Sequence, residues 1–218
     1  MHRFFARAPD GALRPLGCLG LALVGLLAAV APVEAQQGGP DLRLGAGAVV
    51  DFAGGVEYDY SGPGPTPDDS ARATPGLRLH MDYDVHRNVS VGGLLRLSFW
   101  RGGDYYPVSD GRNMLLDLNF RVNGHYDWRD FRFYGAFTIG PTISRLNRDS
   151  ADAFDNPGVG VAAGITPGAE WWFARNVGLY LEMFGWSGHF FRHDLDGPGS
   201  MHVRLNQVTW QFGFVFAL

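Results

Sequence analysis

The chain has 218 residues, of which 46% are hydrophobic and 14% aromatic, and its formal net charge is −4. All 18 basic residues are arginines and they are spread along the chain, so the composition gives no support to nucleic acid as a partner. The single cysteine, Cys18, lies near the N-terminus, which excludes a disulfide framework.

The N-terminal segment has the three parts of a secretory signal peptide. Basic residues at Arg3, Arg7 and Arg14 precede the uncharged apolar run 18–31, and Val33-Glu34-Ala35 supplies the small residues of a cleavage site. The apolar run is shorter than the roughly 18–20 residues that a helix needs to cross a bilayer. We therefore predict that residues 1–35 are a cleaved signal peptide and that residues 36–218 form one domain. Cleavage removes Cys18, which excludes catalysis by a thiol.

After residue 36 the dominant pattern is alternation with a period of two, which is typical of strands with one apolar face. Apolar residues take every second position in eight runs. These runs are Leu42–Phe52, Leu77–Val85, Val89–Phe99, Leu116–Val122, Phe131–Ile139, Val159–Trp171, Val177–Met183 and Val208–Leu218. Pro167 lies within the sixth run and cannot donate a ladder hydrogen bond, so we predict a β-bulge near Thr166–Gly168.

The connections between the runs alternate between long and short. The long ones are rich in Gly, Pro and Asp and span 53–74, 101–113, 142–158 and 187–202. The short ones contain Arg followed by Asn or Asp, at Arg87-Asn88, Arg129-Asp130 and Arg175-Asn176. Tight polar links on one side and long loops on the other indicate an up-and-down barrel. We predict an all-β, eight-stranded antiparallel barrel with both termini, taken as periplasmic, on the short-turn side.

Side-chain volume decides which face of the barrel is apolar. An eight-stranded barrel holds little more than its own side chains, so about forty apolar positions cannot all lie inside. The alternate positions are small or polar, and a closed barrel satisfies its backbone groups in hydrocarbon. We therefore predict a transmembrane barrel with lipid outside and polar groups inside. The expected interfacial aromatic residues are Tyr83, Phe99, Trp100, Trp128, Trp171, Trp172, Phe173, Trp186 and Trp210.

The charges expected inside the barrel nearly cancel. The inward arginines are Arg43, Arg78, Arg96, Arg121 and Arg132. The inward acids are Asp51, Asp82, Asp84, Asp117, Glu170 and Glu182. Because unpaired buried charges are costly, we predict a lumen closed by a structural network of ion pairs, with Arg132 and Glu170 in contact.

The C-terminal sequence QFGFVFAL resembles the signal that the outer-membrane assembly machinery of Gram-negative bacteria reads. The matching positions are Gln211, Gly213, Phe216 and the final Leu218, where most family members have Phe. The chain as a whole resembles the small outer-membrane barrel proteins, in the size class of the outer membrane protein A barrel domain and the X and W types. The resemblance implies contact with outer-membrane lipid and lipopolysaccharide, and insertion by the barrel-assembly machinery. It carries over no functional residue, because in this class the loops, which differ between members, determine function.

Three other kinds of site have candidate residues. The His-x-Ser element of lipid A deacylases does not occur, but Ser187, His189, His193 and Asp194 are candidates for the His, Asp and Ser of palmitoyl-transferring barrels. His189, His193 and Asp194 with Asp196 are candidate metal ligands, although His spacing in a loop means little. Candidate partner contacts in the loops are Tyr58, Tyr60, Tyr105 and Tyr106.

These observations favour a monomeric, non-enzymatic outer-membrane barrel that needs no cofactor or metal. Its structural or surface-interaction role is expected in the four long loops, toward an extracellular ligand that the sequence does not identify. The alternative is a narrow porin-like channel or diffusion path for small or apolar molecules, and a more remote one is a lipid-modifying enzyme. The lumen separates the first two: ion pairs block a pore, whereas apolar or small inward residues with a lateral gap open one.

Overall fold

The computed structural model describes residues 42–52, 54–60, 68–71, 74–100, 113–145, 157–194 and 200–218. The predicted signal peptide, residues 1–35, lies outside the described residues. The strands are β1 (Leu42–Phe52), β2 (Gly54–Tyr60), β3 (Asp68–Ala71), β4 (Thr74–His86), β5 (Val89–Trp100), β6 (Asn113–Trp128), β7 (Phe131–Arg145), β8 (Gly158–Ala174), β9 (Val177–Asp194) and β10 (Ser200–Ala217). No helix long and apolar enough to cross a membrane occurs within these ranges.

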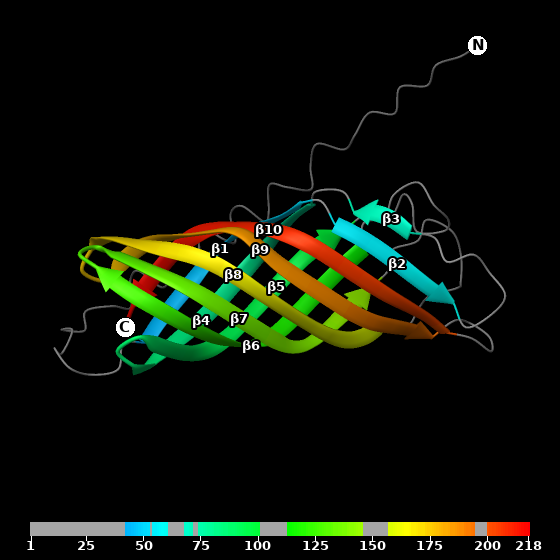
Figure 1. Cartoon of the computed structure of the whole chain (residues 1–218), viewed down its shortest axis with the longest axis horizontal. Coiled ribbons are helices and arrows are strands. Elements are labelled where there is room, and N and C mark those ends of the chain that lie inside the picture. The colour runs from blue at the N-terminus through cyan, green and yellow to red at the C-terminus, as the bar shows by residue number, and fades with distance from the viewer. Residues whose placement is uncertain are drawn as a thin grey trace, which may run out of the picture. The chain divides into compact units, whose positions relative to one another are not determined.

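Eight of the strands form a closed ring in chain order. The order is β1-β4-β5-β6-β7-β8-β9-β10, and β10 returns to pair with β1 (Figure 1). Every pairing is antiparallel. Two short strands extend the sheet at one end, where β2 pairs with β10 and β3 pairs with β2. Because β1 and β2 pair with successive parts of β10, they are two halves of one interrupted strand, and the predicted eight-stranded up-and-down barrel is confirmed.

The three short connections lie where tight polar links are predicted, and they are two-residue turns at 87–88, 129–130 and 175–176. The carbonyl group of the second turn residue accepts a backbone hydrogen bond from the strand beyond. His125 N lies 2.9 Å from Asn88 O, Trp172 N lies 2.8 Å from Asp130 O, and Ala217 N lies 3.1 Å from Asn176 O. The recurring Arg-Asn and Arg-Asp pairs therefore tie each hairpin to the next strand. We call this side of the barrel the turn end and the opposite side the loop end.

The outer wall of the ring is apolar, as the alternation predicts. Leu118, Phe120 and Ile165 are 62%, 54% and 59% exposed on this wall. At the turn end the ring of Phe131 stacks against Trp128 and Trp171, with ring centroids 6.3 and 6.4 Å apart. Six of the expected interfacial aromatic residues are exposed: Tyr83, Trp128, Trp171, Phe173, Trp186 and Trp210. The prediction was wrong for Trp100, which is fully buried inside the barrel.

Strand β9 carries an extra residue about half-way along its length. Its register shifts between Ile165 and Gly168 of β8, and again between Thr209 and Gln211 of β10. Both shifts place the extra residue on β9 beside Phe184, whose φ is 57°. The irregularity thus falls where Pro167 predicts it, but the bulged strand is the partner of the proline strand. A bulge of one residue reverses the alternation of the side chains that follow it.

The polarity of the wall reverses at the loop end. The segment 187–202, predicted as a loop, lies largely in β9 and β10, and Thr142–Arg145 belongs to β7. We call β2, together with the facing ends 190–194 of β9 and 200–205 of β10, the collar. Its inner side chains join an apolar cluster of buried residues: Val56, Tyr58, Trp100, Leu115, Phe191, Met201, Val203 and Leu205. Its outer side chains include Arg204 and Glu57, which are 62% and 50% exposed.

Candidate functional site: the charged lumen

The interior of the ring is filled by charged side chains that sort into three layers between the turn end and the collar. The five arginines and six acids predicted to face inward all do so, and nine of these eleven are buried. The two exceptions are Arg132 and Asp84 at the turn end, whose side chains are 12% and 14% exposed.

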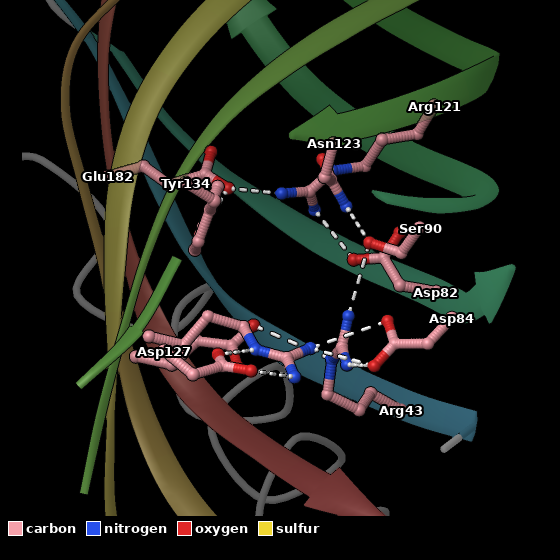
Figure 2. Close-up of polar contacts among 11 residues, drawn as sticks. Arg43, Asp82, Asp84, Ser90, Arg121, Asn123, Asp127, Tyr134 and Glu182 are labelled. Atoms are coloured by element: carbon pink, nitrogen blue, oxygen red, sulfur yellow. Dashed lines mark hydrogen bonds and ion pairs between the residues drawn. The ribbon is translucent and has the colours of Figure 1, made fainter. Parts of the chain in front are cut away.

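The turn-end layer centres on Asp84, which two arginines share. Arg43 Nη1 lies 2.7 Å and Arg132 Nη1 lies 3.1 Å from Asp84 Oδ2. Figure 2 shows Arg43 beside Asp84, with Asp127 farther to the left. Arg43 Nε also lies 3.8 Å from Glu170 Oε1 on the opposite wall.

The prediction that Arg132 contacts Glu170 was wrong. The two residues are opposite one another in the β7–β8 ladder, yet no ion pair joins them within the described part of the chain. Arg132 instead makes a two-point contact with Asp127, its cross-strand neighbour on β6, with Nε–Oδ1 at 2.6 Å and Nη2–Oδ2 at 3.0 Å. A bidentate carboxylate contact is stronger than a single one, so Asp127 holds the guanidinium group.

Glu182 is the centre of the middle layer. Arg121 Nη2 lies 2.9 Å from Glu182 Oε1, and Tyr134 OH donates to the same oxygen at 2.7 Å. Arg78 Nη1 contacts the other oxygen, Oε2. Arg121 Nη1 also lies 3.5 Å from Asp82 Oδ2, and Figure 2 shows the guanidinium group of Arg121 between Glu182 and Asp82.

Aromatic rings and glycines complete the middle layer. The guanidinium carbon of Arg78 lies 5.6 Å from the ring centroid of Tyr180, whose ring meets that of His80 edge-on at 5.0 Å. Both rings fill space that β1 leaves free. A Cβ atom at Gly45 would lie 1.9 Å from the His80 ring, and one at Gly47 would lie 2.4 Å from Tyr180 OH. The glycines of β1 are therefore required by the large side chains of β4 and β9.

The layer nearest the collar centres on Arg96. Its Nη2 lies 2.9 Å from both carboxylate oxygens of Asp51 and 3.0 Å from Gln207 Oε1. Its Nη1 donates to Ser187 Oγ at 3.3 Å. Its Nε lies 3.8 Å from Asp117 Oδ2.

Asp117 also holds His189, which sequence reasoning did not place in the lumen. His189 Nε2 lies 3.0 Å from Asp117 Oδ2, and Thr142 Oγ1 donates to Asp117 Oδ1 at 2.6 Å. His189 was missed because the bulge at Phe184 reverses the inward phase of β9. One signal was present: apolar outward positions change from odd numbers at Leu179, Leu181 and Met183 to even numbers at Phe184, Trp186 and Phe190.

The candidate enzyme and metal residues do not converge. His189 and His193 are buried inside, whereas Asp194 lies on the outer face, where it is 67% exposed and pairs with Arg192. Asp196 lies outside the described residues. Within the described ranges, no group of three or more His, Cys, Asp or Glu side chains is placed to hold a metal ion.

The tyrosines predicted as partner contacts are not seen together on an exposed surface of the described residues. Tyr58 is 1% exposed and faces the interior of the collar, because the polarity of the wall is reversed there. The backbone of Tyr60 ends β2, and Tyr105 and Tyr106 lie outside the described residues.

The proposed assembly-signal residues lie at the seam that closes the ring. Gln211 Oε1 accepts a hydrogen bond from Arg78, and Gly213 faces Gly47 across the β1–β10 pair. A Cβ atom at Gly213 would lie 2.1 Å from Ala46 O. Phe216 is only 7% exposed although the alternation predicted it on the lipid side, and Leu218 is 45% exposed.

The amino-acid sequence matches a known protein family. The sequence profile of the outer membrane protein beta-barrel domain family matches residues 19–216. The chain belongs to this family. Outer-membrane β-barrels of this family are proteins of the Gram-negative outer membrane, so the exposed apolar wall faces lipid and the charged layers lie within the membrane.

Solved outer-membrane β-barrels share the fold. OprG from Pseudomonas aeruginosa superposes with a TM-score of 0.62 at 11% identity, covering 83% of this chain and 96% of OprG. The outer membrane protein AlkL, determined in DMPC bilayers, superposes with a TM-score of 0.51 at 13% identity, covering 86% of this chain and 94% of AlkL. No curated protein sequence matches the chain. At these identities the likeness shows the fold alone.

Ion pairs span the lumen of this outer-membrane β-barrel from one wall to another. Arg43 on β1 reaches toward Glu170 on β8, and Arg78 on β4 contacts Glu182 on β9. Arg121 on β6 contacts the same glutamate. The charged layers thus connect strands that are not neighbours in the ring, and they fix the cross-section of the barrel.

Proposed function

We propose that the protein is a monomeric, non-enzymatic outer-membrane barrel that does not conduct ions and whose structural or surface-interaction role lies at its loop end. The observation that carries this proposal is the series of ion pairs across the lumen. Arg78, Arg121 and Glu182 are between 1% and 2% exposed, so these charges have exchanged water for one another.

The size of the pairing energy supports a closed state. Removing one partner of a buried ion pair commonly costs about 3–5 kcal/mol, because the other charge stays buried without a countercharge. A side chain that rotates out of the network leaves its partner unpaired in the same way. Since 1.4 kcal/mol is a factor of ten, an opening that breaks one such pair is populated in about one molecule in a hundred or fewer. This population supports a closed barrel over a continuously open pore.

The orientation in the membrane follows from the two ends. Outer-membrane barrels have short periplasmic turns and longer extracellular loops. The turn end, with both strand termini Leu42 and Ala217, therefore faces the periplasm, and the collar and long loops face outward. In this orientation the wall contacts outer-membrane lipid and lipopolysaccharide. The C-terminal strand is then available to the barrel-assembly machinery after removal of residues 1–35.

Conductance in planar lipid bilayers tests the proposal. The purified, folded protein should show little or no steady current, and Glu182→Ala should raise the frequency of brief openings because Arg78 and Arg121 lose a shared partner. Glu57→Ala is the control, since Glu57 lies on the outside of the collar and pairs only weakly with Arg204, at 3.5 Å. Large, stable channels in the unmodified protein would overturn the closed barrel.

A second candidate function is a diffusion path for small apolar molecules. The observation that favours it is the apolar cluster inside the collar, where a molecule entering from the loop end would meet Trp100, Phe191 and Met201 before Arg96. Mass spectrometry of molecules that copurify with the folded barrel distinguishes the two. A bound apolar compound that is lost in Phe191→Ser favours the path, and its absence favours the closed barrel.

A further inference from the structure

A small cavity lies between two of the charged layers. Its volume is about 20 Å³, and it is bounded by Arg78 and Glu182 of the middle layer and by Arg96 and Asp117 of the next. It exists because one wall of the lumen carries only small side chains at this height. The lining residues of β7 and β8 are Ala136, Thr138, Ala162, Ala163, Gly164 and Thr166.

Four side chains that line the cavity each have a buried polar atom without a hydrogen-bond partner among the described residues. These atoms are Arg78 Nε, Arg96 Nε, Asn119 Oδ1 and His189 Nδ1. The residues are 2%, 4%, 6% and 1% exposed, so bulk water does not satisfy them. Arg96 Nε lies 3.8 Å from Asp117 Oδ2, which is beyond hydrogen-bonding distance. The residues lining the cavity therefore carry two free donors, one free acceptor and one imidazole nitrogen that donates or accepts according to its tautomer.

The charge and size of the cavity define what it binds. Its two arginines and its two acids cancel, so an ion would add an unpaired charge to a buried site. A water molecule needs about 10–15 Å³ of such space and two to four polar partners. Water accepts from two donors and donates to an acceptor, which matches Arg78, Arg96 and Asn119.

We propose that this cavity is a water-binding site in which one bound molecule joins the middle layer to the layer nearest the collar. The water accepts from Arg78 Nε–H and Arg96 Nε–H and donates to Asn119 Oδ1. The two layers then form one hydrogen-bonded network. The inference uses the ion-pair layers but does not depend on whether the barrel conducts, so a conducting barrel with this water would overturn the proposed function alone.

NMR of the refolded barrel in detergent micelles tests the site directly. Cross-relaxation with water should appear at the side-chain Hε protons of Arg78 and Arg96. Ala162→Val fills the cavity and should remove both signals. Ala169→Val is the matched control, because Ala169 lies in the same strand with its cross-strand partners Phe133 and Leu181 exposed on the outer wall.

The change in the urea midpoint of unfolding tests independently whether the cavity holds water. Displacing an ordered water without replacing its hydrogen bonds is unfavourable, whereas filling a dry void is favourable. The urea midpoint of Ala162→Val should therefore fall below that of the unmodified protein, and that of Ala169→Val should not. The proposal is overturned if neither arginine shows contact with water in the unmodified protein. It is also overturned if the signals persist in Ala162→Val, or if that variant unfolds at a higher urea concentration.

Discussion

At the scale of single residues, the middle layer depends on the carboxylate of Glu182. Two arginines and one tyrosine bind it, and each arginine has only a weaker or neutral second partner. Arg78 otherwise contacts the neutral Gln211, and Arg121 otherwise lies 3.5 Å from Asp82. Removing the charge of Glu182 therefore leaves two buried cations with one carboxylate, Asp82, in contact with only one of them.

We expect Glu182→Gln to lower the free energy of unfolding by about 3–5 kcal/mol, the usual loss when one partner of a buried pair is removed. Glu57→Gln breaks an ion pair whose side chains are 50% and 62% exposed, and an exposed pair contributes about 1 kcal/mol or less. Equilibrium urea unfolding in lipid vesicles, followed by tryptophan fluorescence, compares the two variants. Equal small losses would show that the lumen is hydrated and that the pairing of Glu182 is weak.

The sequence predicts which residues face the lumen better than it predicts their partners. Period-two alternation places Arg132 and Glu170 inside because the pleat leaves a side chain only two directions. It does not give the reach of a long side chain across the lumen. Arg132 turns to Asp127 on one neighbouring strand and to Asp84 beyond it, although Glu170 is its ladder partner on the other.

At the scale of strands, β9 shows how one residue changes a whole segment. Before the bulge, the inward side chains are Tyr180 and Glu182; after it, they are Ser187, His189 and Phe191. If strict alternation is continued past Met183, it predicts inward and outward positions that are the opposite of those observed. The half of β9 nearest the loop end then looks like a polar loop. The boundary of this strand was not predictable from alternation alone, because a bulge is visible only as a change of phase.

Deleting Phe184 should leave the barrel folded, because it removes the extra residue and gives β9 one regular alternation in which Glu182 and His189 both still face inward. Phe184→Gly keeps the extra residue and suits the φ of 57°, so this variant should fold. The shift in gel mobility between boiled and unboiled samples reports the folded barrel. Loss of the shift in the deletion variant, with a normal shift in Phe184→Gly, would mean that the barrel needs the extra residue itself.

The closing seam between β1 and β10 has its own steric requirement. Gly47 and Gly213 are direct partners, and a Cβ atom at Gly47 would lie 2.2 Å from Phe212 O. Because backbone atoms cannot move aside as a side-chain end does, Gly47→Ala should cost about 1–3 kcal/mol, as overpacking does, and slow closure of the ring.

The control for the seam is Gly135→Ala on the outer wall, where nothing lies within 4 Å of the added atom. Refolding into lipid vesicles, followed by the gel shift over time, measures both variants. The seam argument fails if Gly47→Ala closes as fast, and is as stable, as Gly135→Ala.

At the scale of the whole barrel, polarity reverses along the axis. Around the charged layers, apolar side chains face outward and arginines and acids face inward. In the collar, Arg204 and Glu57 face outward while Val203 and Val56 are buried inside. A wall that faces hydrocarbon cannot carry charged side chains cheaply, so the change marks where the barrel leaves the membrane core. The collar is thus a water-facing extension with an apolar interior of its own.

An arginine placed on the outer wall should report this boundary. Ile139 lies at the centre of β7 and is 44% exposed, so Ile139→Arg should destabilise the folded barrel by about 2–4 kcal/mol, the cost of this cation near the bilayer midplane. Phe190 is more exposed, at 54%, but it pairs with Arg204 at the base of the collar, so Phe190→Arg should cost only about 0–1 kcal/mol. Equilibrium unfolding from lipid vesicles measures both variants under one set of conditions. Phe190→Arg removes a larger apolar side chain than Ile139→Arg does. If only the loss of apolar side chain mattered, and not depth in the membrane, Phe190→Arg would be the more destabilising variant. Equal costs, or a larger cost at Phe190, would place the collar within the hydrocarbon.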